Sequence, residues 1–211
     1  MSMKHWIDFT KWPRYQHYLF FKDFEIPRFN MTFTLDITHF YDKCKQKGFR
    51  FYFGMIHQVV EALNQIENFR YRIEDGKVFD ETITHVSFTD LIADTDLFKM
   101  VFVNVDKDLA TFQAKAIAAS QAQGQQLIKM ETEKILNTVY ITSFPWASFQ
   151  HFSHATKLGP TDSVPRISWD RFVEKEGVKT IHISVEAHHG LVDGYHVGLL
   201  IQKLQQQLNQ F

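Results

Sequence analysis

The chain has 211 residues, 45% of them hydrophobic and 15% aromatic, and a formal net charge of −1 without a basic run, which argues against a nucleic-acid interface. Its start, "MSMKHWIDFTKW", lacks the apolar core of a signal peptide, and no segment approaches the roughly 18 apolar residues of a membrane span. Cys44 is the only cysteine, so no intrachain disulfide can form, and we expect a cytoplasmic protein that is not membrane-bound.

The first half of the chain alternates predicted strands and helices. Segment 31–37 is rich in β-branched and aromatic residues and predicts a strand. Segment 39–47 predicts a helix with Thr38 as N-cap and Gly48 at its end, in which Cys44 is a half-buried residue rather than a nucleophile. Helical spacing of apolar residues predicts a second helix over 54–69. The "EDGK" at 74–77 predicts a hairpin tip, and 84–91 and 99–105 predict strands.

The second half continues the alternation. Segment 114–134 is rich in helix formers, with Gly124 weakening its middle, and 138–144 and 179–187 predict strands. Apolar spacing over 196–211 predicts a final helix. The chain has neither the glycine pattern G-x-G-x-x-G nor a phosphate loop, so we expect a mixed α/β sandwich, as one domain over 1–211, without nucleotide-binding fingerprints.

The segment "IHISVEAHHGLVDGYHVG" (181–198) holds the most concentrated chemistry. Strand alternation gives 179–187 an apolar face and a polar face, and His189 falls in phase with the apolar one. Gly190 lets the strand end, and Asp193 and Gly194 turn the chain into the final helix. His189 is therefore expected to be partly buried, where desolvation favours the uncharged imidazole that a general base requires. The apolar face comprises Ile181, Ile183, Val185 and Ala187; the polar face comprises Thr180, His182, Ser184, Glu186 and His188.

Three interpretations of this segment compete. A metal site is the least favoured, because His188 and His189 are adjacent and point to opposite faces of a strand. A structural histidine at a strand end beside an Asp-Gly turn is common. A catalytic histidine with a structural Asp193 four residues later is the third, and it needs support from elsewhere in the chain.

That support comes from a resemblance. "HHGLVDGYHVG" resembles the H-H-x-x-x-D-G motif of chloramphenicol acetyltransferases, whose shorter core is shared with the acyltransferases of 2-oxo acid dehydrogenase complexes. "FTKWPRYQHYLFF" (9–21), "RFYFGMIHQVVEALN" (50–64) and "ITSFPWASFQHF" (141–152) are similar to further stretches of the family, in family order. The resemblance implies a two-layer sandwich with a mixed sheet and a homotrimer. It also implies acetyl-CoA as co-substrate and no metal.

The resemblance also implies roles for individual residues. His189 would be the general base that takes the proton from an acceptor hydroxyl during direct acetyl transfer. Asp193 would pair with Arg14 and hold the histidine loop. Thr142 would stand for the oxyanion-stabilising serine of the family, and Ser168 for a threonine that holds a water molecule. Each site would lie between subunits, with His189 from one and Thr142 and Phe20 mainly from the next.

Two further groups of residues follow from the same resemblance. Those on the coenzyme side are Trp146, Arg50, Tyr52, Arg171 and Phe172. Those on the acceptor side are Phe20, Phe21, Phe29, Phe98, Phe152, His154 and Arg166.

Departures from the family pattern keep alternatives open. The extra methyl of Thr142 restricts the rotation of its side chain. One alternative is therefore a catalytically weak or silent family member that binds a ligand. A lipoamide acyltransferase-like core is a second alternative, although the chain lacks a lipoyl domain. His154 and Arg166 replace apolar positions, and an unpaired buried arginine is costly. The acceptor is therefore expected to be either chloramphenicol or a more polar or anionic alcohol.

Overall fold

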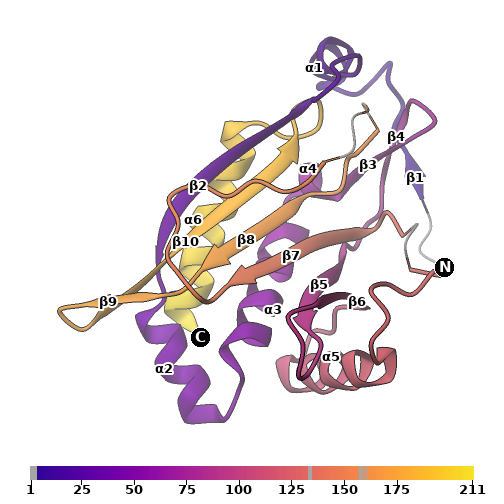
Figure 1. The fold of residues 1–211 in the computed structure, drawn as a ribbon. Helices are drawn as coiled ribbons and strands as arrows, with labels where there is room; N and C mark the ends of the chain where they lie inside the picture. The colour runs from indigo at the N-terminus through magenta and orange to yellow at the C-terminus, as the bar shows by residue number, and fades with distance from the viewer. Residues whose placement is uncertain (1–3, 133–134, 157–158, 160) are drawn as a thin grey trace.

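The computed structural model describes residues 4–132, 135–156, 159 and 161–211, and a seven-stranded mixed sheet dominates it (Figure 1). β7 (Thr138–Phe144) runs parallel to both β5 (His85–Leu91) and β8 (Arg166–Asp170), whereas the other strand pairs of this sheet are antiparallel. The prediction of a mixed sheet is therefore confirmed. The strands lie in the order β2 (Arg28–Asp36), β10 (Val178–His188), β8 (Arg166–Asp170), β7 (Thr138–Phe144), β5 (His85–Leu91) and β6 (Phe98–Val103), and β9 (Val173–Lys175) pairs with β10.

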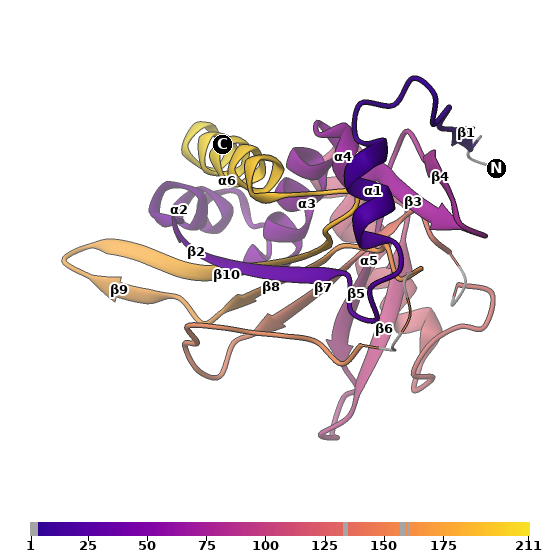
Figure 2. The ribbon, with the colours of Figure 1, turned by 90° about the horizontal axis from the view of Figure 1, so that it is seen from above.

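Helices form the second layer. Figure 2 shows α2 (Thr38–Lys47), α3 (Phe51–Asn64) and α6 (Gly194–Gln210) on one face of the sheet. On the opposite face, the chain that follows β7 crosses the strands. α5 (Leu109–Gln123) packs beside α3 and β6, and α1 (Tyr15–Phe21) lies near the end of the sheet where β2 begins and β10 ends (Figure 1). None of the helices in the described ranges is long and apolar enough to cross a membrane.

The core lies between the sheet and the helices. Ile181, Ile183 and Val185 of β10 are almost fully buried, as the alternation predicts. α2 and α3 approach closely at Gly54, where a Cβ atom would lie 2.9 Å from the Phe40 ring. Cys44 lies in α2 with only 1% of its surface exposed, so it is more deeply buried than predicted. Burial raises the pKa of its thiol to about 11, so the thiol stays protonated and is a poor nucleophile.

The predicted hairpin belongs to a second, three-stranded sheet that the sequence did not indicate. β3 (Tyr71–Glu74) and β4 (Lys77–Asp80) flank a turn in which Asp75 and Gly76 both have positive φ, 49° and 72°. Such dihedrals are typical of a two-residue hairpin turn. β1 (His5–Trp6) pairs with β4. The short helix α4 (Glu67–Arg70) leads into this sheet.

The prediction for 114–134 is wrong at both ends as far as residue 132, and its last two residues lie outside the described ones. α5 begins after Asp108, whose carboxylate accepts from Thr111 N at 2.8 Å, and it ends at Gly124, which has φ 61°. Lys99 Nζ donates to the carbonyls of Ser120 and Gly124, at 2.7 and 3.0 Å, and so satisfies the last turn. Gly124 therefore terminates the helix instead of weakening its middle.

Two other helix boundaries also differ from the sequence prediction. Thr38 is the first residue of α2 rather than its N-cap, and its N–H donates to the Asp36 carboxylate at 2.8 Å. The predicted helix over 54–69 begins earlier, at Phe51, and breaks after Asn64. The side chain of Asn64 bonds both N–H and C=O of Thr84, which ties this break to the start of β5.

The polar face of β10 is buried within the chain over its second half. Ser184, Glu186 and His188 are 2%, 5% and 1% exposed. The chain between β7 and β8 supplies polar partners to two of them: Phe152 O accepts from Ser184 Oγ, and His154 N donates to Glu186. Arg166 of β8 also binds Glu186, and β8 was not predicted as a strand.

Candidate active site

The candidate site is built on the loop that joins β10 to α6. His189 continues from β10, and its N–H donates to the carbonyl of Pro27 at 2.7 Å. Gly190 N donates to His188 Nδ1 at 3.1 Å. A Cβ atom on Gly190 would lie 2.9 Å from the His188 ring, so only glycine fits here without displacing that ring.

Arg14 holds this loop with three separate donors. Its Nη2 donates to the His189 carbonyl at 2.9 Å and its Nε to the Gly190 carbonyl at 3.0 Å. Its Nη1 pairs with Asp193 Oδ2 at 2.7 Å. Charge-assisted hydrogen bonds of this kind are about twice as strong as neutral ones. The guanidinium thus fixes both ends of the loop.

Asp193 links the loop to the final helix. It is the N-cap of α6, and its Oδ1 accepts from Tyr195 N at 3.0 Å and lies 2.9 Å from His196 Nδ1. Burial by itself would raise the pKa of Asp193, but the hydrogen bond from Arg14 and the nearby positive charges outweigh it and hold that pKa at about 2. The carboxylate is therefore ionised at neutral pH.

The His189 ring is enclosed by aromatic side chains, and the residue is partly buried as predicted. The ring stacks on Phe21, with centroids 4.2 Å apart and planes at 7°, and its centroid lies 4.6 Å from that of Phe29. Its Nδ1 is buried and has no hydrogen-bond partner among the described residues. Phe21 and Phe29, both predicted on the acceptor side, thus lie directly against this imidazole.

Hydroxyl side chains form a row across the face of the sheet that carries no helices. Thr142 of β7 pairs in register with Ser168 of β8, which pairs with Ser184 of β10, which pairs with Thr32 of β2. Ser168 is fully buried, and its Oγ lies 3.0 Å from Nε2 of His154. The residue that the resemblance assigns to holding a water molecule is thus already hydrogen-bonded to a side chain.

One chain does not bring His189 and Thr142 together. Ser184 is in register with Ser168 and hence with Thr142, and β10 continues four residues beyond Ser184 before it reaches His188. At about 3.3 Å per residue this is at least about 13 Å along the strands, and β7 lies a further about 10 Å across them. One thioester therefore cannot contact both His189 and Thr142 of the same chain.

Arg166 is not an unpaired buried arginine, and that premise of the acceptor prediction is wrong. It is paired with the carboxylates of Glu186 and Asp162. Arg28 also binds Glu186, at 2.7 Å, and Asp162, at 3.3 Å. Burial alone would raise the pKa of Glu186, but the interaction with His154 and the charges of Arg28 and Arg166 outweigh burial and lower it. Two cations balance two anions, so this cluster does not by itself call for an anionic acceptor.

The predicted coenzyme-side residues fall into different settings. Trp146 is 58% exposed and packs on Phe144, whereas Phe172 packs on Tyr41 of α2. Arg50 and Arg171 are exposed at the start of α3 and just after β8. The hydroxyl of Tyr52 donates to the carbonyl of Thr89 at 2.7 Å, so it is used inside the protein.

The remaining acceptor-side aromatics are separated. Phe20 and Phe98 are 65% and 52% exposed, on α1 and at the start of β6. Phe152 contacts the ring of His154 at 5.1 Å. Phe20 packs on Phe21 with ring centroids 5.0 Å apart, and Phe21 stacks on His189 of the same chain, so Phe20 lies near its own chain's His189 rather than only near that of a neighbouring subunit.

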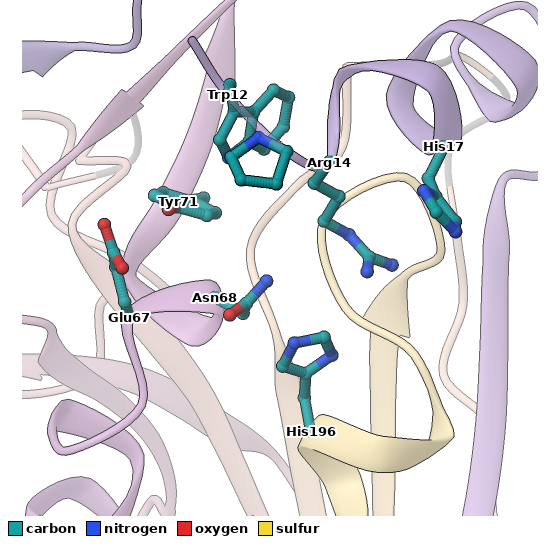
Figure 3. Close-up of a pocket in the computed structure, with 8 residues that line it drawn as sticks. Trp12, Arg14, His17, Glu67, Asn68, Tyr71 and His196 are labelled. Atoms are coloured by element: carbon teal, nitrogen blue, oxygen red, sulfur yellow. The ribbon is translucent and has the colours of Figure 1, made fainter.

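A cavity of about 330 Å³ lies beside the Arg14 pair (Figure 3). Neither His189 nor Thr142 lines it. Asn68, which the sequence analysis did not single out, donates to the carbonyl of Leu191 at 2.9 Å and so supports the loop; no local signal marks that role. The described residues contain no group of three or more potential metal ligands. The lining residues are Trp12, Pro13, Arg14, His17, Glu67, Asn68, Tyr71 and His196.

Known proteins of one family resemble this chain over nearly its whole length. A family model described as "Chloramphenicol acetyltransferase" matches residues 3–205. The chain belongs to the chloramphenicol acetyltransferase family. A chloramphenicol acetyltransferase of Proteus mirabilis is 25% identical over 205 residues, which cover 97% of this chain and 94% of the relative.

Solved structures show the same fold. A chloramphenicol acetyltransferase structure superimposes with a TM-score of 0.90 at 23% identity, covering 98% of this chain and 100% of that chain. A probable dihydrolipoamide acetyltransferase from Listeria monocytogenes 4b F2365 gives 0.67 at 14% identity, covering 92% and 89%. As a member of the chloramphenicol acetyltransferase family, the chain is an acyltransferase with the predicted fold.

The Arg14–Asp193 pair predicts a pH-dependent stability. Because the pKa of Asp193 lies below its ordinary value of 3.8, the pair stabilises the folded state above pH 4 and loses this effect as pH falls toward 2. Asp193→Asn keeps the helix cap but removes the charge. In urea unfolding, we expect the wild type to exceed this variant by a constant margin from pH 5 to 8, on the order of 1–2 kcal/mol for this partly exposed pair. A margin that stays constant down to pH 2.5 would contradict the assignment.

Proposed function

We propose that this protein transfers the acetyl group of acetyl-CoA directly to an acceptor hydroxyl, with His189 as general base. The observation that carries the proposal is the loop held by Arg14, which presents an aromatic-enclosed imidazole at the end of β10. Proton removal by a positioned imidazole typically contributes 10²–10⁴-fold to a rate, roughly. Family membership, which stands on nearly the whole chain, supports the reaction type.

The proposed reaction needs two chemical groups. His189 accepts the proton of the acceptor hydroxyl as its oxygen attacks the thioester carbonyl. The hydroxyl of Thr142 donates a hydrogen bond to the oxyanion that forms. When the C–S bond breaks, the coenzyme leaves as a thiolate and takes the proton back from His189. No acyl-enzyme and no metal are required.

We propose that the site is completed by a second copy of the chain, in a homotrimer. The gap between His189 and Thr142 within one chain supports this arrangement, since both must reach one thioester. The exposed rings of Phe20 and Phe98 are apolar surface that a neighbouring subunit would cover. His189 of one subunit would then face Thr142 of the next.

For the acceptor, we propose either chloramphenicol or a more polar alcohol. The polar alcohol is supported by the side chains that the resemblance places on this side, because His154 and Arg166 lie in a network with Glu186. That network is internally balanced, so an anionic acceptor is no longer required. Phe21 and Phe29 still offer an apolar wall.

A silent relative that only binds a ligand is the second candidate. Thr142 in place of serine and the bond between Ser168 and His154 favour it. A lipoamide acyltransferase-like core has only a distant structural likeness behind it. Calorimetry with acetyl-CoA followed by a turnover assay separates an active enzyme from a silent one.

Replacement of the general base tests the mechanism. We expect His189→Ala to lower turnover by about two to four orders of magnitude, because it removes the group that takes the proton. The affinity for CoA in calorimetry should be unchanged, which serves as the control for folding. Full activity in this variant would remove His189 from the mechanism.

Mixed subunits test the shared site. His189→Ala and Thr142→Val should each be nearly inactive alone, the latter losing about 10²–10³ in rate. Equal mixing in one assembly should restore activity at about a quarter of the sites, where an intact His189 meets an intact Thr142 across an interface. Mixing of folded assemblies without subunit exchange is the control. If co-assembled subunits stay inactive, the two groups do not act across an interface.

A panel of acceptors tests the proposed specificity. We expect release of the coenzyme thiol from acetyl-CoA with at least one polar alcohol, because the acceptor side carries buried charges. Chloramphenicol and a set of alcohols and amines are compared at equal concentration. If chloramphenicol alone supports turnover, the idea of an altered pocket is wrong.

A further inference from the structure

A second histidine–carboxylate pair lies on the same face of the sheet as Thr142 and Ser168. His182 Nδ1 lies 2.8 Å from Asp170 Oδ2, and His182 N donates to Asp170 Oδ1 at 2.7 Å. Ser184 of β10 is in register with Ser168 of β8. On these antiparallel strands, His182 lies two residues before Ser184 and Asp170 two residues after Ser168, so the two residues also face each other. Strand side chains alternate, so this pair lies one row, about 7 Å, from the hydroxyl row.

Asp170 anchors the turn that carries Trp146. The Asp170 side chain is fully buried, and its Oδ2 accepts from Ser148 Oγ at 2.7 Å and from Phe149 N at 3.0 Å. Arg171 N donates to the carbonyl of Ala147 at 3.3 Å. A buried carboxylate is costly unless it is well satisfied, and here these donors satisfy it.

The orientation of the His182 ring leaves one nitrogen available. The Asp170 carboxylate accepts a hydrogen bond from Nδ1 of His182. In a neutral His182 ring the proton is therefore on Nδ1, and Nε2 carries the lone pair. Nε2 points away from the carboxylate, no partner for it is found in the described ranges, and the side chain is 33% exposed. Ser148 donates to Asp170 instead of facing Nε2, so the three residues are not arranged as a nucleophile with its base.

Under the proposed function, with the coenzyme-side residues that the resemblance assigns, the pair lies between the two ends of the bound acyl-coenzyme. The proposed oxyanion donor Thr142 marks the thioester end. Arg171 and Phe172, which follow β8 directly after Asp170, mark the nucleotide end. Between these ends the coenzyme has its pantetheine arm, whose amide N–H groups need acceptors once they leave water.

We propose that the His182–Asp170 pair binds the pantetheine arm of acetyl-CoA by accepting a hydrogen bond from one of its amide N–H groups at His182 Nε2. This inference rests on the proposed function, since it requires an acyl-coenzyme at this site. Asp170 acts as the positioning residue: it fixes the tautomer and the ring, and it holds the turn that carries Trp146.

Two ligands separate the arm from the nucleotide. Calorimetry measures the binding of CoA, and of adenosine 3′,5′-bisphosphate, which lacks the arm. We expect His182→Ala to weaken CoA by about three- to tenfold, the value of one hydrogen bond, and to leave the bisphosphate unchanged. His182→Gln, which keeps an acceptor near the position of Nε2, should recover most of the loss. His39→Ala, which removes an exposed histidine from α2, is the matched control.

Each other outcome is decisive. Unchanged CoA affinity in His182→Ala overturns the inference while the proposed function stands. Equal weakening of both ligands also overturns it, because the effect would then lie at the nucleotide end or in the fold. If the wild type binds neither ligand, the proposed function fails and the inference falls with it. Retained binding of the bisphosphate shows that the variant is folded.

Discussion

The contact between Arg14 and the loop after β10 organises the candidate site. A single guanidinium binds two successive backbone carbonyls of the loop and the carboxylate that caps the next helix. Asp193 therefore serves α6 and Arg14 at once. Loss of either partner would leave a partly enclosed charge without compensation, at a cost on the order of 1–2 kcal/mol. The loop is in this way tied to the N-terminal segment. The backbone of His189 is held in place, although among the described residues no hydrogen bond to its ring Nδ1 is found.

The two faces of the sheet do different work. Toward the helices it is apolar and closely packed, as at Ile183. On the other face, hydroxyls lie in a row and charges lie in balanced groups, such as Arg28 and Arg166 with Glu186. The proposed chemistry uses the second face, but its imidazole stands at one end of β10 and its hydroxyl donor two strands away. If both groups act as proposed, a complete site would need a neighbouring copy of the chain, and this separation is the physical basis of the proposed trimer.

The sequence predicted those elements whose pattern is local. β7 and β10 follow from their composition and alternation, with boundaries within one residue. β8 was missed although Ile167 and Trp169 alternate with polar residues, because five residues with charged ends give a short signal. The start of α5 depends on its N-cap Asp108, whereas its end also depends on Lys99, which lies in β6. The burial of Glu186 depends on Arg28, far away in the chain. In the site, the pairing of Arg14 with Asp193 was expected only from the resemblance, and no pattern connects His182 with Asp170.

The chain between β7 and β8 is held on the sheet mostly by side chains of the strands, through Glu186 at His154 and through Asp170 at Phe149. It contributes almost nothing to the apolar core beneath the helices. Mutation, insertion or exchange in this stretch can therefore change the surface beside the proposed acceptor site while the loop held by Arg14 stays in place. Because the two segments are held separately, substitutions between β7 and β8 can change substrate preference in few evolutionary steps. The same segment is the one to randomise in a directed-evolution library.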